Sequence, residues 1–169
     1  MLARTPLKAI RTCGRVVFEL KGAPITSLAC YCNDCQAGAR QIEALPGAPP
    51  VQAPDGGTAY IVYRKDRVQN IKGANLLKAL KLKPESATNR VIASCCNAAM
   101  FLNFDDGKHW VDIYQERAGA SAPPLKMRVC TKFAPKAASV PADVPGYAGY
   151  PLSLIVKLIG AKFAMLFGR

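Results

Sequence analysis

Three cysteines stand within six positions, in the order Cys30-x-Cys32-x-x-Cys35. The two side chains of a C-x-C pair point the same way along extended backbone, and a helix that begins after the pair brings the third thiol back toward them. A position near a helix N-terminus also favours the thiolate form that a metal ion requires. The spacing therefore favours a zinc site over a C-x-x-C redox pair, in which Cys30 would be superfluous, and over three buried thiols without a ligand.

The number of thiols in this motif bears on what a zinc ion could do there. Zinc takes four ligands at a structural site, whereas a catalytic site has three protein ligands and an open position. Cys30, Cys32 and Cys35 are an incomplete structural set and a complete catalytic set. We therefore expect one zinc at this main site, with its fourth position open to water, to a substrate thiol or to a distant residue.

The chain has four further cysteines, which are spread along it: Cys13, Cys95, Cys96 and Cys130. Cys13 precedes one predicted strand and Cys95-Cys96 end another, so these strand ends could form a second, structural metal site. Adjacent residues of an extended chain point to opposite sides, so one of Cys95 and Cys96 is equally well explained as a small buried residue. An odd number of cysteines and the lack of an apolar secretory core near the N-terminus predict a reducing, cytoplasmic setting.

The elements that position these cysteines are predominantly strands. Alternating or β-branched patterns predict extended segments at 15–21, 25–32, 59–65, 76–84, 89–96, 108–114 and 125–133. The segment 33–45 has helical periodicity, with Asn33 or Asp34 as its N-cap and Pro46-Gly47 as its stop. The cysteine motif is thus expected where a strand ends and a short helix begins.

The C-terminal part of the chain differs in composition from the rest. A β domain over residues 1–133 is followed by a linker rich in proline, alanine and glycine at 134–151 and by an apolar helix at 152–169. This helix is short for a membrane span and contains Lys157 and Lys162. Because it lacks a clean polar face, we expect it to pack on its own domain or to join a homo-oligomer rather than to lie on a membrane surface.

The formal net charge of +12 makes the surface attractive to nucleic acid, acidic small molecules or anionic lipid. A run of five or six like charges does not occur in the sequence, and no predicted helix is studded with arginine. The charge pattern therefore argues against nucleic acid as the partner.

The order of three motifs resembles one protein family. The motifs "TCGRVVFEL", "CYCNDCQ" and "SCCNAAMF" stand in the order seen in the glutathione-dependent formaldehyde-activating enzymes, a family that includes centromere protein V. The resemblance runs from about residue 11 to residue 114, and "GGT", "LKLKP" and "SCCN" are most similar to an uncharacterised bacterial branch of the family. It implies a mainly β fold of twisted, packed antiparallel sheets that holds two zinc ions.

In that family C-x-C-x-x-C holds the catalytic zinc, a role that the resemblance gives to Cys30, Cys32 and Cys35. The structural zinc of the family uses C-x-C-G and C-x-x-C-G, and this sequence departs from both motifs. Arg11 replaces the first cysteine of one and Ala93 the first cysteine of the other. The residues that remain for a degenerate second site are Cys13, Cys95 and Cys96.

The resemblance implies chemistry of the carbon–sulfur lyase type, in which zinc holds the sulfur of glutathione or a related thiol while a bond to an aldehyde carbon is made or broken. Asp34 could accept a proton or cap the helix, and His109 is not expected to be a ligand. Basic residues could recognise the carboxylates of glutathione, and the candidates are Arg15, Arg40, Lys81 and Lys83. The alternative is a non-catalytic zinc domain that uses its basic surface to bind a partner protein, nucleic acid or a membrane.

Overall fold

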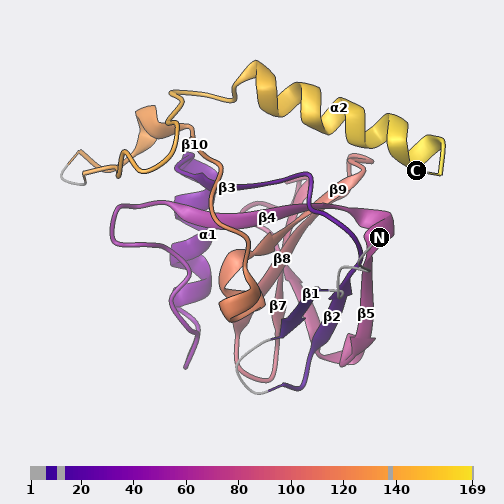
Figure 1. Ribbon diagram of the computed structural model, residues 1–169. Helices are drawn as coiled ribbons and strands as arrows, with labels where there is room; N and C mark the ends of the chain where they lie inside the picture. The colour runs from indigo at the N-terminus through magenta and orange to yellow at the C-terminus, as the bar shows by residue number, and fades with distance from the viewer. Residues whose placement is uncertain (1–6, 11–13, 137–138, 169) are drawn as a thin grey trace.

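The computed structural model describes residues 7–10, 14–136 and 139–168, and strands dominate this part of the chain (Figure 1). The strands are β1 (Leu7–Ile10), β2 (Val17–Leu20), β3 (Thr26–Cys30), β4 (Thr58–Arg64), β5 (Val68–Lys72), β6 (Leu77–Leu80), β7 (Thr88–Ala93), β8 (Ala98–Phe104), β9 (Trp110–Tyr114) and β10 (Met127–Val129). The α-helices are α1 (Asn33–Glu43) and α2 (Leu152–Leu166), and short 3-10 turns are η1 (Lys65–Arg67), η2 (Ala74–Leu76), η3 (Gln115–Ser121) and η4 (Thr131–Phe133).

The strands form a small sheet with the order β1-β2-β5 and a large sheet with the order β10-β3-β4-β9-β8-β7-β6. Every named pair of neighbours is antiparallel except β10 and β3, which run parallel. The prediction of a mainly β protein with antiparallel sheets, a short helix after the cysteine motif and a C-terminal helix is confirmed. The parallel pair was not predicted, because its two strands lie almost a hundred residues apart in the sequence.

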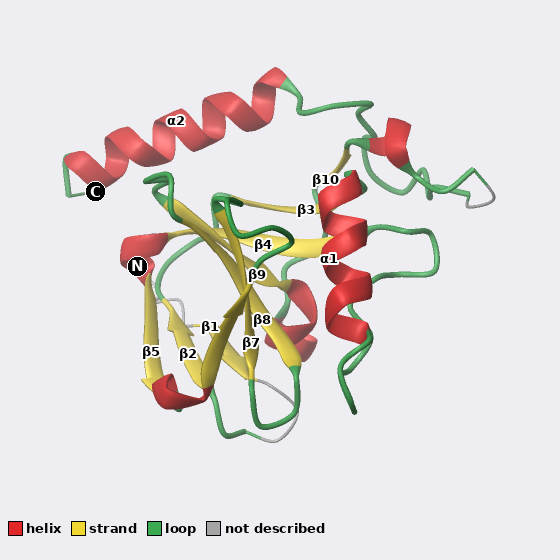
Figure 2. Cartoon of the chain, turned by 180° about the vertical axis from the view of Figure 1, so that it is seen from behind, coloured by secondary structure: helices red, strands yellow, loops and turns green. Residues whose placement is uncertain are grey.

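The large sheet is buried on both faces. Along β4, Tyr60 and Val62 belong to one cluster of core residues, whereas Ile61 and Tyr63 belong to the other. The first cluster includes Ile42 of α1 and residues of α2, and the second includes residues of β2 from the small sheet. Helices therefore cover one face of the large sheet and the small sheet covers the other (Figure 2). Burial on both faces explains the continuous apolar run of β4.

Strand β8 was not predicted from the sequence, and its neighbouring turn explains why. The predicted strand at 89–96 ends at Ala93, and a tight turn then places Asn97 at a positive φ of 54° before β8 begins. The β8 sequence "AAMFLNF" contains no β-branched residue, so local propensity gives little sign of a strand. Cys95 and Cys96 consequently lie in the turn between β7 and β8 and not within extended backbone.

The segment that leads to α2 is held against β10. The backbone of Arg128 donates to the carbonyl of Pro145 and accepts from the N–H of Tyr147, and its guanidinium pairs with Asp143 at 3.0 Å. Helix α2 then crosses over one end of the large sheet (Figure 1), with the ring nitrogen Nε2 of His109 2.8 Å from the carbonyl oxygen of Leu158. None of the helices in the described part of the chain is long and apolar enough to span a membrane.

Candidate metal centre and its pocket

The three cysteines of the motif meet where β3 gives way to α1. Cys30 is the last residue of β3, and Cys32 is the N-cap of α1, with extended dihedral angles and a sulfur that accepts from the N–H of Cys35 at 3.3 Å. The sulfur atoms of Cys30, Cys32 and Cys35 all lie within 4.8 Å of one another, so they form a cluster that could hold a metal ion. The prediction that Asn33 or Asp34 caps this helix was wrong, because the sulfur of Cys32 occupies the capping position.

Hydrogen bonds among the sulfurs determine which thiol loses its proton first. Hydrogen bonds from Cys30 and Cys35 lower the pKa of the Cys32 thiol, and the backbone N–H groups at the start of α1 add to this effect. The same hydrogen bonds, together with burial, raise the pKa of Cys30. Cys32 is therefore the first thiolate of the cluster, and a metal ion that binds all three sulfurs must displace the protons of the other two.

A fourth thiol, Cys130, lies beside this cluster. The parallel register that places Val129 next to Cys30 puts Cys130 directly after it, with a left-handed φ of 59° and only 4% of its surface exposed. Burial raises the pKa of the Cys130 thiol, which is in hydrogen-bonding contact with Cys30 and Tyr150. Cys130 is not one of the three cysteines whose sulfurs lie within 4.8 Å of one another, so in this conformation it stands outside the cluster.

The three sulfurs open onto a pocket of about 410 Å³. Its floor includes all three cysteines, its walls come from β4, β7, β8 and β9, and residues of α2 form its roof. The hydroxyl of Tyr60 donates to the sulfur of Cys35 at 3.7 Å and so fixes one side of the floor. Asp34, in the first turn of α1, is exposed and lines the same pocket.

Among the described residues, two basic ones line the pocket, and neither was predicted. Arg90 is only 2% exposed, and its Nη2 donates to the carbonyl oxygen of Asp34 at 2.7 Å, while Nη1 has no hydrogen-bond partner among the described residues. The side chain of Arg90 packs directly against α1 at Gly38. A Cβ atom added at this glycine would lie only 1.8 Å from Nε of Arg90. Lys108 is the second basic residue, and it pairs with Asp106.

The four basic residues proposed from the sequence do not line this pocket: Arg15, Arg40, Lys81 and Lys83. Lys81 instead forms an ion pair with Asp105 at 2.7 Å. The sequence did contain one sign of Arg90, namely the glycine inside α1. A glycine costs about 1 kcal/mol relative to alanine within a helix and is tolerated when another group needs the space.

Asp112, on β9, is the acidic side chain that the large sheet contributes to the pocket wall. It is partly buried, and desolvation raises the pKa of its carboxyl to about 7, against a small opposing effect of Lys108. The other titratable residues that line the pocket are the three cysteines, Asp34, Tyr60, Arg90, Lys108 and Tyr150. Asp112 can therefore hold or release a proton near neutral pH in the same pocket as the sulfurs.

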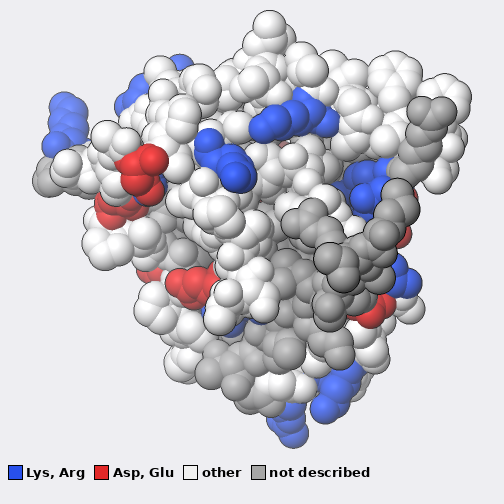
Figure 3. All heavy atoms as spheres, viewed as in Figure 1, with Lys and Arg blue, Asp and Glu red and all other residues white. Residues whose placement is uncertain are grey.

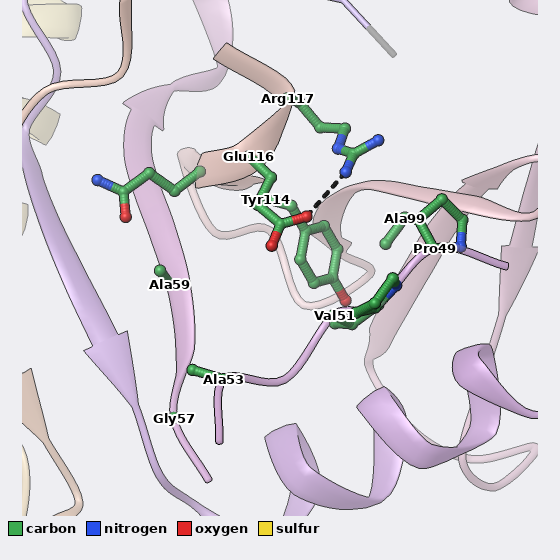
Figure 4. Close-up of a pocket in the computed structure, with 11 residues that line it drawn as sticks. Pro49, Val51, Ala53, Gly57, Ala59, Ala99, Tyr114, Glu116 and Arg117 are labelled. Atoms are coloured by element: carbon green, nitrogen blue, oxygen red, sulfur yellow. Dashed lines mark hydrogen bonds and ion pairs between the residues drawn. The ribbon is translucent and has the colours of Figure 1, made fainter. Parts of the chain in front are cut away.

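A second pocket lies elsewhere and has a different character. It measures about 70 Å³, and alanine, proline, valine and Tyr114 make up much of its wall (Figure 4). An ion pair of 3.0 Å joins Arg117 to Glu116 at one side of it. None of the described cysteines lines this pocket, and its volume suits ordered water better than an organic ligand.

The residues of the predicted second metal site are only partly described. Cys95 and Cys96 are partly buried and pack against the core cluster on the face of the sheet opposite to that of Cys30. Arg11 and Cys13 lie outside the described residues, so the proximity of Cys13 to the turn stays a prediction. His109 contacts α2 through Leu158, and it is not among the residues that line the main pocket.

Comparison with known proteins gives a likeness to solved structures but not to a family model. No family model matches the sequence, and no curated protein matches it. A crystal structure of a Rhodobacter sphaeroides protein, described as a structural genomics target, is similar over 82% of this chain and 98% of that chain. The two sequences are 12% identical over this region, and the TM-score is 0.49.

Proposed function

We propose that this protein is a zinc-dependent enzyme of the carbon–sulfur lyase type, which makes or breaks the bond between a thiol and an aldehyde carbon. The observation that carries the proposal is the cluster of three sulfurs on the floor of a pocket of about 410 Å³. The reaction type comes from the resemblance of the C-x-C-x-x-C motif to that of the formaldehyde-activating family. A purely structural cluster would have no need of such a pocket.

The donor set suits zinc. Zinc–sulfur bonds of about 2.3 Å at tetrahedral angles separate two sulfurs by about 3.8 Å, and the three sulfurs of the cluster lie within 4.8 Å of one another. Small side-chain rotations would therefore bring Cys30, Cys32 and Cys35 to bonding positions. A zinc ion bound there would supply a Lewis acid and a place for the sulfur of the substrate.

Asp112 is positioned to move the proton that the reaction requires. When a hydroxyl-bearing thiol adduct breaks down, its hydroxyl proton passes to the Asp112 carboxylate, the carbon–oxygen double bond forms, and the carbon–sulfur electron pair stays on sulfur. In the reverse direction the protonated Asp112 returns the proton to the carbonyl oxygen as the sulfur attacks. A pKa of about 7 makes both forms of the carboxyl accessible near neutral pH.

Exchange NMR tests the proposal. Zinc-loaded protein is added to a mixture of formaldehyde and a small thiol, and the rate at which the adduct forms and breaks is measured. We expect faster exchange with the wild type, loss of the acceleration in Cys32→Ser, and a rate about a hundredfold lower in Asp112→Asn. A wild-type protein that exchanges the adduct no faster than Cys32→Ser contradicts the proposal.

One observation favours a second candidate, a non-catalytic zinc module. Cys130 is buried and in contact with Cys30, so a modest rotation could add a fourth thiolate and close the site. A closed four-thiolate site is structural. Zinc that binds as tightly to Cys130→Ser as to the wild type supports the open site, whereas loss of zinc from this variant supports the structural module.

A further inference from the structure

We propose that the pocket binds an apolar thiol, alkyl or aryl, and its aldehyde adduct, with the sulfur at the three cysteines and the apolar part between the sheet and α2. This inference rests on the proposed function and specifies its substrate class. The resemblance to the formaldehyde-activating family implies glutathione, a tripeptide with two carboxylates and an ammonium group. The pocket walls point to a different thiol.

The walls beyond the sulfurs are apolar on both sides. The sheet contributes Leu102, Phe104 and Trp110, and the helix above them contributes Leu154, Ile155 and Leu158. The rings of Phe104 and Trp110 lie 5.9 Å apart and form one aromatic surface. An alkyl or aryl group between these walls would be shielded from water on both sides, which is favourable. The charged groups of glutathione would lose their hydration there, which is unfavourable.

The charges of the pocket also disfavour a dianionic ligand. Asp34 and Asp112 both line it, and Lys108 is already paired with Asp106. Lys108 also lies 4.7 Å above the centre of the Phe104 ring. The guanidinium of Arg90 is also engaged: its Nη2 donates to the carbonyl oxygen of Asp34, one residue from Cys35, and its Nη1 is buried without a hydrogen-bond partner among the described residues. The described residues of the pocket wall thus supply two acidic and two basic side chains, a balance that does not favour a ligand with two carboxylates.

Trp110 is the only tryptophan of the chain and lines the pocket, so its fluorescence reports when the apolar part is occupied. Cobalt-substituted protein is titrated with ethanethiol, butanethiol, hexanethiol, benzyl mercaptan and glutathione under anaerobic conditions. The cobalt absorption reports sulfur binding, and the Trp110 fluorescence reports the apolar contact. We expect the affinity to rise about fourfold for each added methylene and to be lowest for glutathione.

A pair of adjacent residues on α2 supplies the matched variants. Leu158 lines the pocket, whereas Ile159 is 50% exposed on the outside of the helix. Leu158→Gln should weaken hexanethiol binding about tenfold, and Ile159→Gln should leave it unchanged. If glutathione binds more tightly than hexanethiol, the apolar substrate class is wrong while the thiol site stands. If no thiol changes the cobalt absorption, the thiol site itself is wrong and this inference falls with it.

A separate feature, the outer face of α2, carries a second inference. We define the outer stripe as the residues that follow one another at spacings of four and three along the side of the helix away from the sheet: Leu152, Val156, Ile159, Phe163 and Leu166. Each is between 50% and 74% exposed. The opposite side of the helix contacts the core through Leu154 and Leu158. The helix is therefore apolar on two opposite faces, and within the described part of the chain only one of them is covered.

The charges beside the outer stripe indicate what covers it. At about 100° per residue, Lys162 falls at the edge of the stripe, about 80° from its centre line, whereas Lys157 falls about 140° from that line on the other side of the helix. After Asp143 the sequence contains no acidic residue, and the upper edge of the molecule in Figure 3, where α2 lies in Figure 1, is white with separate blue side chains. Two copies of α2 packed together would bring lysines near one another without an acidic partner. We infer that the outer stripe binds an anionic membrane surface, with Lys162 at the level of the lipid headgroups and Lys157 adding positive charge farther from the surface.

Flotation with vesicles tests this second inference on the full chain. We expect binding to phosphatidylcholine vesicles that contain phosphatidylserine, little binding to phosphatidylcholine alone, and weaker binding at high salt. Phe163→Gln should reduce binding about tenfold, and Phe133→Gln, at an exposed phenylalanine outside α2, should not. Absence of binding to anionic vesicles, or a wild-type dimer that Phe163→Gln converts to a monomer, would overturn the inference.

Discussion

The two groups of neighbouring cysteines, Cys30-Cys32-Cys35 and Cys95-Cys96, differ in what the fold does with them. The first group lies where a strand ends and a helix begins, so the backbone turns its three sulfurs toward one another and toward a pocket. The second group lies in a tight turn between two antiparallel strands and packs on the opposite face of the sheet. The cysteines of both groups are close in sequence. In the first group the sulfurs also converge on a pocket, so spacing along the chain does not by itself make a metal site.

The largest effect expected from this comparison is on metal content. Cys32→Ser removes the thiolate that loses its proton first and should lower zinc affinity at least about a hundredfold. Zinc per chain, measured by elemental analysis after dialysis against a weak chelator, should fall from about one to none. Cys95→Ser is the matched control and should retain the metal. Equal loss of zinc in the two variants would show that the two groups of cysteines do not differ in metal binding.

A pair of helix-interior glycines tests how tightly the fold supports the cluster. A Cβ at Gly38 would meet Nε of Arg90 at 1.8 Å, so Gly38→Ala should displace Arg90 and reduce the free energy of unfolding by about 2–3 kcal/mol. Gly160 in α2 has no atom within 4 Å of the corresponding position, so Gly160→Ala should add up to about 1 kcal/mol. Urea denaturation measures both changes. A stabilised Gly38→Ala would show that Arg90 does not lie against α1.

A smaller effect is expected on the free energy of unfolding when the Asp112 carboxyl in the pocket wall ionises. The Asp112 carboxyl keeps its proton up to a pKa of about 7 in the folded protein, whereas an unfolded aspartate ionises near 3.8. Its contribution to stability is therefore complete below about pH 4 and is lost as the pH rises to about 7. Because Asp112 is only partly buried, we expect a loss of about 1–2 kcal/mol.

Thermal melting of the wild type and of Asp112→Asn between about pH 4 and pH 8 measures this loss of stability. The melting temperature of the wild type should decline relative to that of the variant across this range. Parallel curves for the two proteins would show that burial does not shift the pKa of Asp112.

Some of this arrangement could be predicted from the sequence, because it depends on local patterns. The alternation of strand residues, the helix after the motif and the apolar C-terminal segment all follow from short-range periodicity. The i, i+2, i+5 spacing likewise predicts that three sulfurs converge. The role of Cys32 as a helix cap could not be found in this way, since Asn33 and Asp34 have the better general propensity and sulfur caps are unusual.

The remaining residues of the site come from distant parts of the chain. Cys130 reaches Cys30 because β10 pairs in parallel with β3, and no local pattern specifies that register. Arg90 and Asp112 reach the pocket because β7 and β9 are part of the same sheet as β3. Long-range strand pairing thus decides which charged residues face the sulfurs, and the basic residues chosen from the sequence alone did not line the pocket.

Zinc K-edge X-ray absorption tests the central claim, an open zinc site with three thiolates, most directly. The wild-type protein should show three sulfur atoms at about 2.3 Å and one lighter ligand. A fourth sulfur should appear when an apolar thiol is added, and Cys130→Ser should give the same two spectra. Four sulfurs in the thiol-free wild type that fall to three in Cys130→Ser would contradict the claim and identify a closed structural site.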